Sequence, residues 1–188
     1  MRLIVGISGA SGAIIGCETL RVLHGMADVE THLVATEGGI RMIKEETPYS
    51  YEDACAFADC VHDDRDLGAL ISSGSFVTSG MVIAPCSMKS LSALAHGYDA
   101  SLLVRAADVC LKERRSVVLL PREMPLNRTH LKNMLACADA GCCIIPPVLT
   151  FYNNPESIGD QIRHIIAKSL MQFGIDVPGF KAWQGFVG

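Results

Sequence analysis

Two segments of the sequence combine small residues with hydroxyl groups, a composition suited to binding an anion. The first is GISGASG at residues 6–12, which carries the hydroxyls of Ser8 and Ser11. Glycines let backbone N–H groups approach a phosphate at the start of a helix, where the helix dipole favours negative charge. The spacing suits a flavin edge or phosphate. A dinucleotide, with Glu37 on its ribose hydroxyls, and an unliganded turn stay open as alternatives.

The second segment is APCSMKS at residues 84–90, which also leads from a predicted strand into a predicted helix. It offers the hydroxyls of Ser87 and Ser90 and the free amides of a helix start to a ligand. A simple N-cap would account for Ser87 by itself. Because two such loops occur at strand ends, we favour a ligand site for both.

A predicted helix carries two cations on one face. Arg105 and Lys112 are seven residues apart, which is about two helical turns, so they could hold an anion together. The alternative is that both are solvated charges paired with Asp108 and Glu113. The sequence alone leaves both interpretations open.

The last two strand ends add further polar groups. Arg122 and Glu123 lie between two prolines, and a carboxylate held beside a cation is a candidate for proton transfer, although a loop salt bridge is possible. Tyr152 follows the last predicted strand, and Lys168 lies on the helix after it. As isolated features, these two are more often a core aromatic and a surface lysine.

Alternating strands and helices must position these groups. Apolar runs predict strands at residues 2–7, 29–35, 81–84, 117–120 and 142–145, with a short strand near 60. Helical spacing and breaker residues predict helices at 13–25, 87–97, 101–114, 126–140 and 155–173. A further helix is predicted between the strand that ends at 35 and residue 46. Strands that are apolar on both faces indicate a three-layer α/β fold with a doubly wound parallel sheet, flavodoxin-like or Rossmann-like. Ligands then bind at the carboxyl ends of the strands, in the loops beginning at 8, 36, 85, 121 and 146.

Composition limits the class of protein. A chain of 188 residues with 49% hydrophobic content predicts one domain over 1–188. The net charge of −4 argues against nucleic acid as the main partner. The short apolar start is unlike a signal peptide, and no uncharged apolar run is long enough to cross a membrane, so we expect a cytoplasmic protein.

The cysteines and the C-terminal segment add two expectations. The eight cysteines lie in apolar segments without CxxC pairs at zinc spacing; even Cys60 near His62 is better explained as a core thiol than as a metal ligand. The tail at 175–188 carries Phe180, Trp183 and Phe186, which it cannot bury by itself. We expect the tail to pack on the body or on a neighbouring subunit of a homo-oligomer.

Taken together, the motifs resemble the UbiX family of flavin prenyltransferases, and most closely the form described as the B component of hydroxyarylic (phenolic) acid decarboxylases. The resemblance covers nearly the whole chain. Its marks, in order, are GISGASG at 6–12, ETPYS at 46–50, SSGSF at 72–76, PCSMKSL at 85–91, RAADVCLKERR at 105–115, LLPREMPL at 119–126 and PPVLTFYNNPES at 146–157. Seven such segments in order are far more specific than any one of them.

The resemblance implies roles for particular residues. Flavin mononucleotide (FMN) would be bound by Gly9, Ala10, Ser11, Thr36, Ser87, Met88, Lys89, Ser90 and Arg122. The phosphate of dimethylallyl phosphate would be bound by Arg105, Lys112, Tyr152 and Lys168. The catalytic set would be Ser11, Glu46, Lys112 and Glu123, with the two glutamates moving protons.

The resemblance also implies a reaction and an assembly. The isoprenyl unit would be joined to N5 and C6 of reduced FMN, and the prenylated FMN would serve a UbiD-type aromatic acid decarboxylase. The family is usually dodecameric, with FMN at contacts between neighbouring chains. No metal is expected, because three cations and a phenol can offset the charge that develops on a departing phosphate.

One segment departs from the family pattern. Separately, three other functions compete with the one that the family implies. TEGG at 36–39 has Glu37 and two glycines where a serine, a basic residue and a bulkier residue are expected, although Thr36 keeps a hydroxyl. A flavin-dependent cysteine decarboxylase would share the fold, but its PxMNxxMW pattern is replaced here by PREMPLNRTHLKNM. A non-catalytic flavin carrier and a nicotinamide dehydrogenase are the second and third competing functions.

Overall fold

Six parallel strands form one sheet in the computed structural model, which describes residues 1–185. The strands are β1 (Arg2–Ile7), β2 (Glu30–Ala35), β3 (Cys60–Asp63), β4 (Gly80–Cys86), β5 (Ser116–Pro121) and β6 (Cys142–Ile144). They are ordered β3-β2-β1-β4-β5-β6, and each neighbouring pair is parallel. The predicted doubly wound parallel α/β fold is therefore confirmed.

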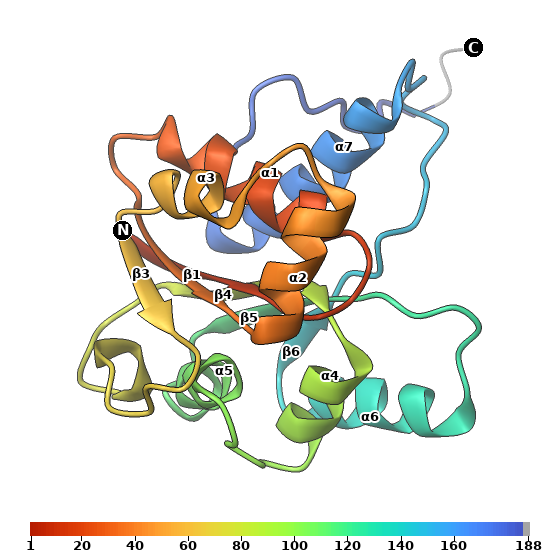
Figure 1. Cartoon of the computed structure of the whole chain (residues 1–188). Helices are drawn as coiled ribbons and strands as arrows, with labels where there is room; N and C mark the ends of the chain where they lie inside the picture. The colour runs from red at the N-terminus through yellow and green to blue at the C-terminus, as the bar shows by residue number, and fades with distance from the viewer. Residues whose placement is uncertain (186–188) are drawn as a thin grey trace.

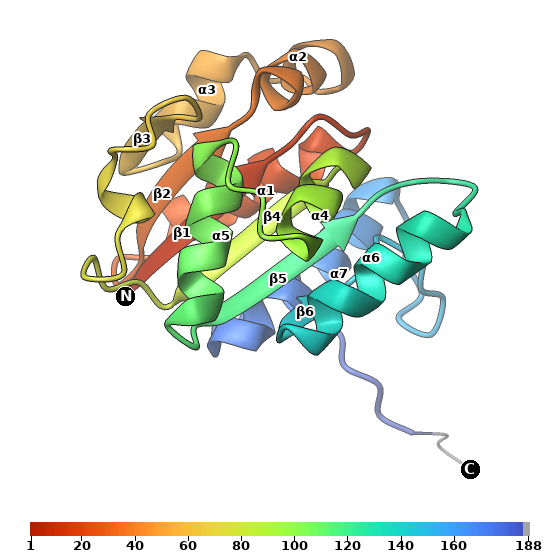
Figure 2. The same cartoon turned by 90° about the horizontal axis from the view of Figure 1, so that it is seen from below.

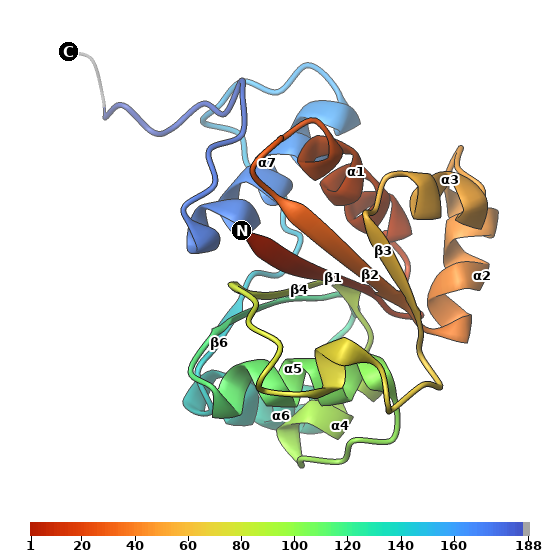
Figure 3. The ribbon, with the colours of Figure 1, turned by 90° about the vertical axis from the view of Figure 1, so that its left-hand side faces the viewer.

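Helices cover both faces of the sheet. They are α1 (Ala13–His24), α2 (Glu37–Glu46), α3 (Tyr51–Ala56), α4 (Met88–Ala95), α5 (Leu102–Lys112), α6 (Arg128–Asp139) and α7 (Ile158–Leu170), with short 3-10 turns at Leu70–Ser72 and Met171–Phe173. Helices α1, α3 and α7 lie on one face and α4, α5 and α6 on the other, while α2 flanks α1 (Figures 1 and 3). Figure 2 shows the second group in front of the sheet.

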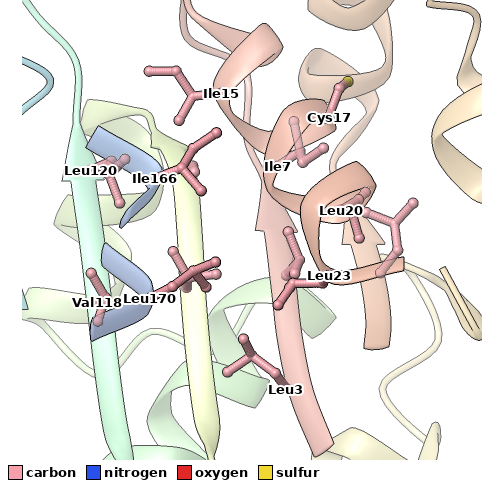
Figure 4. Close-up of a cluster of buried hydrophobic side chains, with 14 of the residues drawn as sticks. Leu3, Ile7, Ile15, Cys17, Leu20, Leu23, Val118, Leu120, Ile166 and Leu170 are labelled. Carbon is pink, nitrogen blue, oxygen red and sulfur yellow. The ribbon is translucent and has the colours of Figure 1, made fainter. Parts of the chain in front are cut away.

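The strands are apolar on both sides because both faces are covered. From Leu3 to Ile7 every residue of β1 is buried, and all seven residues of β4 are buried. On the α1 and α7 side, Leu3, Ile7, Val118 and Leu120 from the strands meet Leu20, Leu23, Ile166 and Leu170 from the helices (Figure 4). This burial supplies most of the driving force for the fold.

The strand order reverses between β1 and β4, which makes this the switch point of the sheet. After β1 the chain crosses to one face as α1, and after β4 it crosses to the other face as α4 (Figures 1 and 2). The two connecting loops therefore separate at the carboxyl edge of the sheet. In open α/β sheets ligands bind at such a point.

Several predicted boundaries were wrong by one to three residues, and three of these differences have a clear local cause. Strand β4 was predicted to end at Ala84 but continues to Cys86, because the register shifts between Ile83 and Cys86 and so accommodates Pro85, which has no N–H to donate. The predicted helix from 126 begins at Arg128, because Asn127 is its N-cap. The predicted helix from 155 begins at Ile158, because the Ser157 side chain accepts a hydrogen bond from Asp160 N.

The C-terminal segment packs back on the body in its first part. Ile175 and Val177 are buried, and Phe180 packs against the same core cluster as α1 and α7. The Trp183 ring lies edge-on to the Tyr152 ring, with centroids 5.6 Å apart. Phe186, which the sequence also suggested would dock, lies outside the described residues.

All eight cysteines are free, and none pairs with another in a disulfide. Five of them are buried, as expected for core thiols, and Cys55, Cys60 and Cys143 are half-buried. Within residues 1–185, no helix has the length and apolar character needed to cross a membrane.

At Gly16, α1 packs directly against the backbone of β4. A Cβ at Gly16 would lie 2.2 Å from the carbonyl oxygen of Ala84 and 2.8 Å from the Ile7 side chain. Because the overlap involves backbone, Gly16→Ala should cost about 1–3 kcal/mol of unfolding free energy. Urea unfolding followed by circular dichroism measures this.

Gly25→Ala at the end of the same helix is the matched control. Its Cβ would have only an ordinary contact, 3.7 Å from Val22 O, and its φ of −79° suits alanine. This variant should be neutral or more stable by about 0.4–1 kcal/mol. Equal stability of the two variants would contradict the close packing described here.

Candidate functional site

Ser8 joins the two loops at the switch point. Its hydroxyl donates to Pro85 O at 2.9 Å and accepts from Ser87 N at 2.7 Å, while its own amide also donates to Pro85 O. Ser8 is fully buried, so these hydrogen bonds are shielded from water. The start of α4 is thereby held at a fixed position relative to the glycine loop that opens α1.

The sequence of the second loop builds the start of α4. Ser87 is the N-cap, and its hydroxyl accepts from Ser90 N at 3.2 Å and donates to Ser90 Oγ at 3.2 Å. Burial raises the pKa of the neighbouring Cys86 thiol, so Cys86 is neutral and is not a nucleophile. The loop is therefore a set of hydroxyls and amides at a helix start.

A cavity of about 630 Å³ opens beside this loop. Its size is in the range of small-molecule and cofactor sites. It is lined by residues from the end of β2, from α4 and from the start of α5, namely Thr36, Lys89, Ser90, Ser92, Ala93, His96, Tyr98, Ala100, Ser101 and Val104. Three residues predicted to contact flavin, Thr36, Lys89 and Ser90, thus line one cavity.

The TEGG segment is explained by close backbone packing. A Cβ at Gly39 would lie 2.2 Å from Ile7 O, and a Cβ at Gly9 would lie 3.0 Å from the Cα of Gly38. Thr36 caps α2 by accepting from Gly39 N at 3.0 Å. The two glycines therefore let α2 sit directly against the first loop, while the Thr36 hydroxyl serves as a cap.

Helix α2 ends at the predicted proton-transfer residue Glu46, which reaches back to the first loop. Its Oε2 accepts from Gly12 N at 2.8 Å. Gly12 has a φ of 98°, and it leads directly into α1. The structure thus places Glu46 beside the segment that contains the predicted residues Ala10 and Ser11.

The loop after β5 begins at the same edge of the sheet. Arg122 N donates to Cys86 O at 3.1 Å, which places the start of this loop next to the α4 loop and its half-buried Met88. The side chains of Arg122 and Glu123 are exposed, and Glu123 accepts from Met124 N at 3.0 Å. No salt bridge joins Arg122 to Glu123 among the described residues, so that alternative is not supported.

Arg105 lies near the start of α5 between two carboxylates. Its Nη1 contacts Asp99 Oδ2 at 2.9 Å and Asp108 Oδ2 at 3.2 Å, and its Nε donates to Ser72 O at 3.3 Å. Burial, with the nearby Asp99, raises the pKa of Asp108 above its ordinary value. Arg105 is two-thirds buried at its side chain and is held in a fixed orientation.

Lys112 and Lys168 lie toward the amino ends of the strands, opposite the carboxyl ends where the loops described above begin. Lys112 ends α5, four residues before β5 begins, and its Nζ contacts Glu113 Oε1 at 2.6 Å. Lys168 is exposed near the end of α7, which also runs toward the amino ends of the strands. Within one chain, Lys112 therefore does not meet Ser87 or Glu123. Arg105 and Lys112 instead make the ion pairs with Asp108 and Glu113 that the sequence offered as the alternative to an anion clamp.

Tyr152 lies on the loop before α7 and pairs with His164. The Tyr152 hydroxyl and His164 Nε2 are 3.2 Å apart. Burial, with the nearby Lys168, lowers the pKa of His164, which favours the neutral ring that can accept from the phenol. His164 thus contacts Tyr152 and lies four residues, about one helical turn, before Lys168 on α7.

Sequence analysis missed several residues that shape the site. Asp64 accepts from Leu103 N at 2.9 Å and so caps α5 from a distant loop, because Ser101 makes no side-chain cap. His96 and Tyr98 line the cavity from the turn after α4. The signal for these two was the break at Gly97, while nothing local indicated Asp64.

Comparison with known proteins identifies the family to which this chain belongs. The sequence profile of the Flavoprotein family matches residues 1–171. The chain is 56% identical over 185 residues to the UbiX-like flavin prenyltransferase of Sedimentibacter hydroxybenzoicus, covering 98% of each chain. The chain belongs to the UbiX-like flavin prenyltransferases. The resemblance found in its motifs is thereby confirmed.

Two solved structures of UbiX-type proteins superpose closely. A dodecameric FMN-dependent UbiX-like decarboxylase from Escherichia coli O157:H7 has a TM-score of 0.97 at 50% identity, covering 98% of this chain and 100% of that one. AnUbiX (PadA1), in complex with FMN and dimethylallyl pyrophosphate, has a TM-score of 0.96 at 44% identity, covering 99% and 98%.

The cysteine decarboxylase alternative receives less support. The FMN-dependent cysteine decarboxylase TvaF has a TM-score of 0.68 but only 14% identity to this chain. Likeness at that level shows a shared fold and nothing more. The UbiX-like family assignment rests on sequence identity over the full length.

Ser8→Ala tests the link between the two loops. The change leaves Pro85 O and Ser87 N without their side-chain partner in a buried position, which typically costs about 1–3 kcal/mol. We expect lower stability in urea unfolding and weaker FMN binding in a fluorescence titration. Ser79→Ala, at an exposed position before β4, is the control and should change neither quantity. Unchanged FMN affinity in Ser8→Ala would show that Ser8 does not contribute to FMN binding.

Proposed function

We propose that this UbiX-like flavin prenyltransferase transfers a dimethylallyl group from dimethylallyl phosphate to reduced FMN. The observation that carries the proposal is the cavity beside α4, which is lined by residues at the starts of α4 and α5, among them the cationic Lys89. The close relatives are named as flavin prenyltransferases, and the AnUbiX structure contains FMN and a dimethylallyl pyrophosphate.

The residues present fit an FMN. Thr36, Ser90 and Ser92 line a cavity large enough for a flavin ring, and Lys89 adds positive charge. The glycine loop from Gly9 to Gly12 carries little side-chain bulk, which lets a phosphate approach its backbone. Two of its amides already have partners in the chain, since Gly12 N donates to Glu46 and Ala10 N donates to Ser8 O. When bound in its reduced form, the flavin would supply N5 and C6 as the atoms that are prenylated.

The phosphate of the second substrate requires cations, and the chain offers them in two separate places. Arg105 is oriented by Asp99 and Asp108 near the carboxyl edge, whereas Lys112 lies at the far end of the same helix. We propose that the complete phosphate clamp forms between neighbouring chains. Tyr152 and Lys168 would contribute a phenol and a further cation. Together these groups would offset charge developing on the departing phosphate without a metal.

We propose that two carboxylates, those of Glu46 and Glu123, move protons. Glu46 already accepts a hydrogen bond from Gly12 N, so it lies within reach of a ligand bound by the first loop. Glu123 is exposed on the loop that begins beside the α4 start, where a ligand or a neighbouring chain could cover it. We propose that Ser11 orients the flavin between these two groups.

A wider context follows from the family. We propose that the prenylated FMN is delivered to a UbiD-type aromatic acid decarboxylase in the cytoplasm, and that the chain assembles as a dodecamer. Exposed apolar side chains near the site support an assembly, among them Met124 at 80% and Phe151 at 72% exposure. We also propose that residues 1–188 act as one flavin-binding domain, whose tail packs on the body or on a neighbour.

Product analysis tests the proposed reaction directly. The protein is incubated anaerobically with reduced FMN and dimethylallyl phosphate, and the extracted flavin is examined by mass spectrometry. The proposal predicts a flavin carrying one additional five-carbon unit. Bound but unmodified FMN would instead indicate a flavin carrier. Absence of FMN binding, with binding of a nicotinamide dinucleotide, would indicate a dehydrogenase.

Lys112→Ala tests the phosphate clamp. Removing a preorganised charge of this kind typically lowers the rate by about a hundredfold or more. We expect prenylated flavin to be nearly abolished in the same assay, while FMN still binds, because Lys112 is distant from the cavity within its own chain. Lys132→Ala, at an exposed position on α6, is the control and should react normally. Normal prenylation by Lys112→Ala would refute the clamp.

A further inference from the structure

Potential metal ligands and supporting groups gather at the β2 and β3 edge of the sheet, away from the flavin cavity. In the parallel register His32 of β2 is paired with Cys60 of β3. Residues two apart along a strand point to the same face. Glu30 and His32 therefore share a face with Cys60 and His62, and Figure 3 shows this pair of strands at one edge of the sheet.

Three of these side chains bring different ligand atoms together. One carboxylate oxygen of Glu30, one ring nitrogen of His32 and the Cys60 sulfur all lie within 4.8 Å of one another. His32 Nε2 is 3.1 Å from Glu30 Oε1. A thiolate, an imidazole and a carboxylate are all ligands that Zn²⁺ accepts in a tetrahedral site.

Neighbouring groups hold these ligands in place. Arg2 Nε contacts Glu30 Oε2 at 2.8 Å, which leaves Oε1 facing His32. His32 Nδ1 is 2.9 Å from His62 Nε2, so the other nitrogen of the His32 ring also has a partner. Histidines that bind metals almost always have such a second partner, which fixes the ring and its tautomer.

The cluster is covered on one side and open on the other. The Phe76 ring packs edge-on against His32 with centroids 5.2 Å apart, and Arg2 lies over the same Phe76 ring. His32 is 1% exposed, whereas the Glu30 side chain is 42% exposed. An ion could therefore enter past Glu30 and bind against a buried imidazole.

We propose that Glu30, His32 and Cys60 form a zinc site, with His62 supporting the His32 ring and a water molecule completing the coordination. Without metal, His32 Nε2 donates its proton to Glu30, and His62 Nε2 donates to His32 Nδ1. Zinc would bind the lone pair of His32 Nε2, so the proton of the His32 ring would move to its Nδ1. His32 Nδ1 would then donate to His62 Nε2, and the His62 ring would carry its own proton on Nδ1. Both rings stay neutral, and one proton leaves, from the Cys60 thiol.

The position of the site indicates a structural role. Strand β3 has four residues and pairs with β2 alone, so it is the edge of the described sheet. A zinc ion bound by Glu30 and His32 of β2 and by Cys60 of β3 would cross-link the two strands. His32 and Thr36 are four residues apart along the chain, which is about 13 Å in an extended strand, so the ion would not touch a ligand in the flavin cavity.

Zinc binding to the FMN-loaded protein tests the proposal. Equilibrium dialysis against Zn²⁺ should show one equivalent bound, and zinc should raise the unfolding temperature, because it binds only the folded state. The isosteric changes Cys60→Ser and Glu30→Gln should each weaken binding by about 100-fold or more, and His62→Gln by about 10–100-fold. Cys55→Ser, at another half-buried cysteine, should bind zinc normally.

Cobalt provides an independent readout at the same site. Co²⁺ bound to the wild-type protein should add a thiolate-to-cobalt absorption band to the difference spectrum, and the band should be absent in Cys60→Ser but present in Cys55→Ser. Normal FMN binding by each variant shows that it is folded. Failure of the wild-type protein to bind one equivalent of zinc would overturn the proposal. So would wild-type affinity in the Cys60→Ser, Glu30→Gln double variant.

Discussion

The arrangement of the site depends on the buried hydroxyl of Ser8. This single oxygen donates to Pro85 O and accepts from Ser87 N, and so it joins the two loops that separate at the switch point. The Ser8 amide also donates to Pro85 O, so the hydroxyl adds to a backbone link between the same loops. Because of it, the amide-rich start of α4 and the glycine loop before α1 act as one surface. Close glycine contacts then bring α2 against that surface.

Most of the fold could be predicted from the sequence, because both faces of the sheet are covered and each central strand is therefore an apolar run. The errors occur where local signals compete. Pro85 suggested the end of β4, but a shift in register lets the strand continue to Cys86. Two helices start later than predicted, at Arg128 and not 126 and at Ile158 and not 155, because Asn127 and Ser157 are their N-caps.

The site was predictable only where it is built from consecutive residues. Thr36, Ser87, Lys89 and Ser90 follow strand ends directly, and the structure brings them to one edge. Contacts between distant segments were not predictable: Glu46 meeting Gly12, Asp64 capping α5 and Arg105 held by Asp99 arise from the packing of whole elements. The pairing of His32 with Cys60 is of the same kind, although the spacings EXH and CXH on two strands were visible in the sequence.

The length of α5 has a consequence for how the protein can function. The helix separates Arg105 from Lys112 by about 10 Å along its axis, and Asp99 and Asp108 hold the Arg105 guanidinium in place. If both cations serve one substrate, a solitary chain retains a flavin pocket but lacks a complete place for the donor. Dilution that separates the chains would then stop the reaction, because the donor phosphate would lose the groups that a neighbour supplies.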